Sequence, residues 1–182
     1  MIKDPTLFFN LSLATVAWIA CSFNYFLLMY SVKNLGGNIY INSSLIALAG
    51  VLGKFITLGL KKYVSSKRSM IICFFITFLF GFGLIFLHEG WMISTCIGFC
   101  LMGIGGAFTL LFFLNNEYFP PLFIGFAFSV TQFGARGMSI LSFLMSDLKE
   151  PIPMVLLCAT SGLALFSLIF LSKPRINQEN KK

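Results

Sequence analysis

Charged residues are scarce in this chain of 182 residues, and acidic residues are the scarcest of them. Asp and Glu together number 6, Lys and Arg number 13, and charged residues make up 10% of the chain. A soluble domain carries about 25% charged residues, so this sequence could not cover a water-facing surface. Because 58% of the residues are hydrophobic and the mean hydropathy is +0.91, the chain is predicted to be an integral membrane protein.

Residues that build metal and catalytic sites are also few. The one histidine, His88, stands in a polar turn beside Glu89, without a second ligand or a nucleophile near it in the sequence. All 5 cysteines lie in apolar runs, and no histidine or carboxylate joins Cys96 and Cys100 on their shared helix face. We therefore expect that the chain is not an enzyme and that it binds no cofactor and no metal. A nucleic-acid partner is not needed to explain the net charge of +7, because membrane proteins collect basic residues on one side.

Long apolar runs fill most of the chain. A helix needs about 20 apolar residues to cross about 30 Å of hydrocarbon, and a β-barrel strand is far shorter. Six runs are long enough, which predicts an all-α membrane protein with a single six-helix transmembrane domain over residues 1–182. The predicted spans are residues 7–32, 39–60, 69–87, 91–114, 122–145 and 153–171.

Polar connections and prolines separate the predicted spans. The connections are short, and they include Ser65–Arg68 and the pair Asn115-Asn116. Pro120-Pro121 and Pro153 fit helix starts, where the missing N–H of proline costs nothing. The sequence therefore predicts consecutive helices without a soluble domain or a long linker.

Lysine and arginine are distributed unevenly between the two sides of the predicted bundle. Cytoplasmic loops of membrane proteins carry an excess of these residues. One side has nine and the other has two: Lys3, Lys61, Lys62, Lys67, Arg68, Lys173, Arg175, Lys181 and Lys182, against Lys33 and Lys149. Both termini are thus predicted on the cytoplasmic side, or on the matrix side if the membrane is the mitochondrial inner membrane. Nothing in the sequence selects between the plasma membrane and an organellar membrane.

Two basic residues remain, Lys54 and Arg136, and both lie inside predicted spans. A cation near the bilayer centre costs about 2.5–3.5 kcal/mol and usually faces a cavity or a partner. No acidic residue lies inside a predicted span, and the nearest one, Glu117, stands at a helix end. We interpret the pair as an anion-attracting site on a water-filled cavity. Two alternatives stay open: Lys54 could extend its amine to the headgroups, and Arg136 could bind a backbone carbonyl or a neighbouring chain.

Several motifs resemble one family of membrane transporters. They are an aromatic pair within Phe23–Phe26, the loop Asn34–Asn42 (sequence NLGGNIYIN), the basic segment Lys61–Arg68 and the element Asn116–Pro120. Together they resemble the C-terminal six-helix half of a major facilitator superfamily transporter, in its organic cation/anion transporter branch. The resemblance covers nearly the whole chain, and the Asn34–Asn42 loop is its most specific part.

The resemblance implies both a fold and a set of site residues. The fold would be half of a major facilitator bundle. In that family, arginine at the position of Arg136 goes with organic anions and aspartate with organic cations, and Lys54 falls on a basic position of the anion transporters. The implied substrate-binding residues are Lys54 and Arg136, with Tyr25, Asn24 and Tyr40 as polar groups that line the cavity. For the last three, ordinary hydrogen bonds between helices are an alternative.

Some residues depart from the family pattern. Ile124 stands where the family has an arginine four residues after Pro120, and the terminal Pro-Glu-Thr element is reduced to Pro174-Arg175. Related transporters hold their substrate between two six-helix halves, and this chain supplies one. The chain is thus a fragment, a half that pairs with a second chain, or a half that serves as a structural subunit.

Two functions follow from these observations. The first is a transporter-like half-bundle for organic ions, of the anion type. The alternative is a transport-inactive structural or accessory subunit of a larger membrane complex. The expected partners are a second transporter half or other membrane subunits, membrane lipid that includes anionic lipid, and a small organic anion if transport is active. Nucleic acid is not among them.

Overall fold

The fold is described here from a computed structural model that covers residues 5–31, 39–87, 90–148 and 151–171. Its helices are α1 (Pro5–Ser31), α2 (Ile39–Lys61), α3 (Ser66–Phe86), α4 (Gly90–Tyr118), α5 (Pro121–Ser146) and α6 (Ile152–Phe170). Several features singled out in the sequence lie outside the described residues: Lys3, Lys33, the loop part Asn34–Asn38, His88, Glu89, Lys149 and the tail from Lys173 to Lys182.

Each of the six predicted spans is a helix, which confirms the predicted all-α class. In the part of the chain that the structure describes, 5 helices are long and apolar enough to cross a membrane. The remaining helix, α5, contains Gln132, Arg136 and several serines, which lower its mean hydropathy. The chain is a multi-pass membrane protein whose least apolar helix, α5, carries Arg136.

Two of the predicted connections are wrong in length, because helices continue through them. Asn115-Asn116 was predicted as a turn but lies within the end of α4, and residues Ser66–Arg68 form the first turn of α3. The two helices remain in contact at this end, where Ser66 Oγ donates a hydrogen bond to Glu117 Oε1 at 2.7 Å. Interhelical packing therefore overrides the turn preference of asparagine.

The prolines mark helix starts as predicted. Pro120 caps the N-terminus of α5 and Pro121 is its first residue, while Pro153 lies in the first turn of α6. A proline at these positions removes only an N–H that has no partner within the helix.

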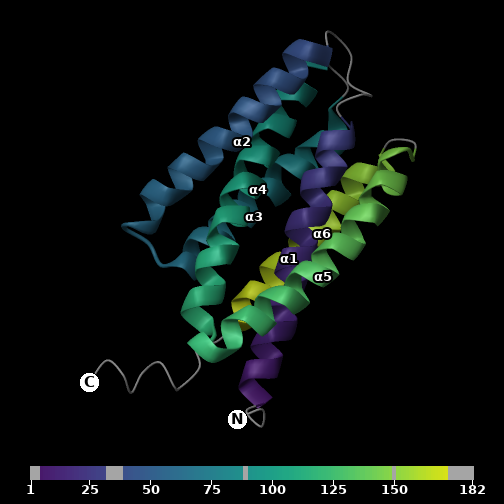
Figure 1. Cartoon of the computed structure of the whole chain (residues 1–182). Coiled ribbons are helices and arrows are strands. Elements are labelled where there is room, and N and C mark those ends of the chain that lie inside the picture. Colours follow the sequence, from purple (N-terminus) through teal and green to yellow (C-terminus); the bar gives the residue numbers. More distant parts are fainter. Residues whose placement is uncertain (1–4, 32–38, 88–89, 149–150, 172–182) are drawn as a thin grey trace.

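The helices form two triplets whose main contacts mirror each other (Figure 1). Helix α1 packs on α5 and α6, as α4 packs on α2 and α3, and the pairs α1–α4 and α3–α6 join the triplets. Helices α1 and α4 are three passes apart and run in opposite directions, which is the arrangement of an inverted repeat. The start of α1 and the end of α6 lie at the same end of the bundle (Figure 1).

Glycines set a close contact between α2 and α4. A Cβ atom at Gly53 would meet the backbone of Met102, and one at Gly105 would meet the backbone of Gly50. Small residues at such positions let membrane helices approach each other closely. Because Gly53 faces α4, the next side chain, Lys54, is turned about 100° around the helix from that contact.

Candidate functional site

Lys54 and Arg136, the two cations inside the predicted spans, line one hollow of about 500 Å³. Lys54 comes from α2 and Arg136 from α5, and these helices lie on either side of α1 and α4 (Figure 1). Helices α1 and α4 supply the other lining residues, none of which is acidic. The hollow is therefore positively charged on two opposite walls.

Aromatic rings form the floor of the hollow. Tyr25 packs edge-to-face on Phe26 and Phe108, with ring centroids 5.4 and 6.1 Å apart. The fully buried Trp18 meets Phe108 edge-on at 5.5 Å and Phe112 edge-on at 5.1 Å. Edge-to-face packing of this kind fixes the orientation of each ring. The result is a rigid apolar floor between two cationic walls.

The structure brings one of the three predicted polar residues, Tyr25, together with the two cations. Asn24 lies elsewhere and is fully buried: its Nδ2 donates to Ser161 Oγ at 2.9 Å, and its Oδ1 accepts from Thr160 Oγ1 at 2.6 Å. These bonds join α1 to α6. Tyr40 is 80% exposed in the first turn of α2 and is not among the residues that line the hollow.

Replacing Asn24 by leucine is expected to lower the stability of the bundle by about 1–2 kcal/mol, because two hydrogen bonds between helices are lost. Thermal unfolding in detergent measures this change. Ser12→Ala is the matched control, since Ser12 is exposed on the same helix and its hydroxyl donates to the Phe8 carbonyl within that helix. Anion binding by the folded Asn24→Leu variant should stay unchanged, and a loss would return Asn24 to the binding site.

Helix α4 supplies most of the floor, and reasoning from the sequence missed it. The lining residues of α4 follow helical spacing: Gly105, Phe108, Thr109, Phe112 and Phe113. Intervals of three and four residues mark one face of a helix. That spacing is visible in the sequence, but an aromatic stripe is equally typical of helix packing and so did not identify a site.

Glu117 is engaged at the basic end of the bundle and does not line the hollow. Its Oε1 accepts the hydrogen bond from Ser66 and lies 3.7 Å from Lys61 Nζ. The same Lys61 Nζ lies 3.1 Å from the centroid of the Phe113 ring. Glu117 thereby ties the end of α2 and the start of α3 to α4.

Two curated proteins are similar to this chain, although no protein-family model matches it. Over 148 residues the chain is 27% identical to solute carrier family 22 member 12 of Homo sapiens. Over 144 residues it is 25% identical to solute carrier family 22 member 21 of Mus musculus. These partial similarities support a relation to transporters of the major facilitator type. Both relatives are solute carriers, which agrees with the expectation of a membrane protein that is not an enzyme.

Each alignment covers 78% of this chain and 26% of the relative. The chain thus spans about a quarter of the length of the curated relatives that it matches.

Proposed function

We propose that the chain is a transporter half that contributes the anion-selective wall of an organic-ion carrier. The observation that carries this proposal is that Lys54 and Arg136 line the same hollow, whose described lining contains no acidic residue. Charged side chains within membrane spans usually face a cavity and mark the path of a substrate or an ion. A volume of about 500 Å³ is within the usual range for a small-molecule site.

The charge and the floor of the hollow favour an aromatic or aliphatic carboxylate as ligand. A carboxylate can accept two parallel hydrogen bonds from the Arg136 guanidinium, a geometry that neutral groups do not match. Lys54 would add a second positive charge on the opposite wall. The apolar body of the ligand would pack on Phe108 and Phe112, as the apolar lining of most ligand pockets does.

A second half would complete the site in this proposal. Arg136 is exposed on the surface of the chain, and a cation left against lipid would be costly. In major facilitator transporters the substrate lies between two six-helix halves near the midplane. We propose that a second half covers this wall, with the basic end of the bundle on the cytoplasmic or matrix side.

Binding of three aromatic probes of similar size tests the proposed charge preference. The chain is purified in mild detergent with the subunits that accompany it, and is titrated with benzoate, benzamide and benzylammonium by calorimetry. We expect benzoate to bind at least about tenfold more tightly than benzamide, because hydrogen bonds to a charged group are stronger. Equal binding of the three probes, or a preference for benzylammonium, would contradict an anion site.

The same purification separates the proposal from the alternative function. A transporter half should co-purify with a second half in equal amount. A structural or accessory subunit should co-purify with a large assembly of membrane subunits and bind none of the three probes. Anion binding together with a second half is therefore the outcome that the proposal requires.

A further inference from the structure

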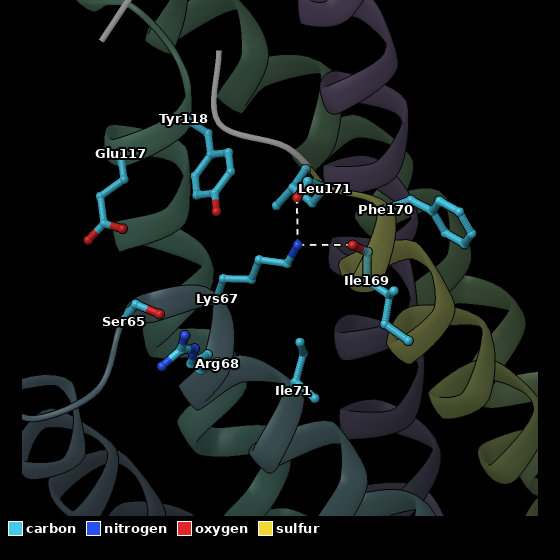
Figure 2. Close-up of a pocket in the computed structure, with 9 residues that line it drawn as sticks. All are labelled: Ser65, Lys67, Arg68, Ile71, Glu117, Tyr118, Ile169, Phe170 and Leu171. Carbon is cyan, nitrogen blue, oxygen red and sulfur yellow. Dashed lines mark hydrogen bonds between the residues drawn. The ribbon is translucent and has the colours of Figure 1, made fainter. Parts of the chain in front are cut away.

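A second hollow, of about 670 Å³, lies at the basic end of the bundle and shares no residue with the first (Figure 2). It forms where the start of α3 meets the ends of α4 and α6. Its lining residues are Ser65, Lys67, Arg68, Ile71, Glu117, Tyr118, Ile169, Phe170 and Leu171. Polar side chains come from α3 and α4, and apolar ones come mainly from α6.

Lys67 reaches across this hollow to the end of α6 (Figure 2). Its Nζ donates hydrogen bonds to Ile169 O at 2.9 Å and to Leu171 O at 2.6 Å. These carbonyls belong to the last turn of α6 and to Leu171, the C-cap residue that follows it, where backbone acceptors lack partners within the helix. An ammonium group has three donors, and among the described residues the structure gives Lys67 two acceptors, which leaves one N–H for a ligand. Carbonyls bring no net charge, so these two hydrogen bonds do not pair Lys67 with an anion.

Arg68 adds a second positive charge beside Ser65 (Figure 2). Its side chain is exposed, and no hydrogen bond or ion pair is found for its guanidinium among the residues that the structure describes. The carboxylate on this wall, Glu117, already accepts a hydrogen bond from Ser66 and faces Lys61. Lys61, Lys67 and Arg68 outnumber this one carboxylate, so the region around the hollow has a surplus of positive charge.

The opposite wall of the same hollow is apolar. Ile169 and Phe170 are 61% and 51% exposed at the end of α6, and Ile71 continues this surface along α3. A ligand that filled the hollow would thus place an anionic group at the membrane surface and a hydrocarbon chain toward the bilayer.

We propose that this hollow binds the phosphate headgroup of an anionic phospholipid from the leaflet at the basic end of the bundle. The phosphate would lie between Lys67 and Arg68, and an acyl chain would cover Ile169 and Phe170. Basic pockets between transmembrane helices on this side of a membrane are suited to such headgroups. A soluble phosphate ester shares the headgroup chemistry but would leave the apolar wall uncovered. The site is independent of the proposed anion transport, because it shares no residue with the first hollow.

Native mass spectrometry of the purified chain tests the lipid site. The chain is incubated with equal amounts of phosphatidylglycerol and phosphatidylcholine of the same acyl chains, and the retained lipid is counted. We expect preferential retention of phosphatidylglycerol, and a decrease of about fivefold in Arg68→Gln. Arg68 is exposed, so the variant should fold, and Arg68→Lys should keep most of the binding because it keeps the charge.

Lys62→Gln is the matched control, since Lys62 is an exposed cation in the turn that precedes α3 but does not line the hollow. Its lipid retention should equal that of the unchanged chain. An equal decrease in Lys62→Gln and Arg68→Gln would show diffuse surface attraction and overturn the site. Displacement of the lipid by millimolar glycerol 3-phosphate would assign the hollow to a soluble phosphate ester and overturn the lipid assignment.

Discussion

The variant Gly53→Ala is expected to lose about 3 kcal/mol of stability, which is the upper part of the usual range for overpacking. The new methyl group would overlap the carbonyl oxygen and the Cα atom of Met102, and these backbone atoms cannot turn aside as a side chain could. Helices α2 and α4 would have to separate along their contact. In thermal unfolding monitored by size-exclusion chromatography, we expect a decrease of about 10 °C in the melting temperature.

Gly59→Ala provides the control in the same helix. A Cβ atom at Gly59 would meet nothing within 4 Å, so the substitution adds no collision. Its melting temperature should stay unchanged or rise slightly, because alanine favours a helix over glycine by about 1 kcal/mol. If both variants were destabilised equally, the effect would come from helix composition, and the close contact of α2 with α4 would be wrong.

The helices of this protein could be predicted from the sequence because the bilayer imposes a minimum length. Each span needs about 20 apolar residues, and that requirement can be read without knowing any contact. The positions of the helix ends were predicted less accurately than the spans. Asn115-Asn116 has the composition of a turn, but packing against α3 keeps both residues helical. Beyond the apolar length that the bilayer requires, contacts between helices determine where each helix ends.

The candidate site was predictable in part, for a similar physical reason. A cation in an apolar run is visible by itself, and the cost of burying it points to a cavity, as for Lys54 and Arg136. The sequence does not show in the same way that the side chain of Asn24 points toward α6. Helix α1 is apolar around most of its circumference, so its sequence does not indicate which face meets α6 and which meets the hollow. That orientation depends on the packing of all the helices together.

Arg136→Asp is expected to weaken benzoate binding by about thirtyfold, equivalent to about 2 kcal/mol. The substitution removes the guanidinium that would pair with the carboxylate and places a negative charge on the same wall. Lys54 remains on the opposite wall, so the two charges of the hollow cancel. Benzylammonium should therefore bind more tightly than before, but without a strong preference over benzamide. Lys62→Asp changes the charge by the same amount outside the hollow and should leave all three affinities unchanged.

Adding Lys54→Gln to Arg136→Asp should reverse the charge preference of the hollow from anions to cations. The hollow would then carry one negative charge and no positive charge among its described lining residues, and benzylammonium should become the preferred probe. Calorimetric titration of the single and double variants with the three probes measures each step. If a folded Arg136→Asp variant bound benzoate with unchanged affinity, Arg136 would not belong to the binding site. If the single variant lost benzoate but the double variant gained no benzylammonium, Arg136 would hold the ligand while Lys54 would have no part in selecting its charge.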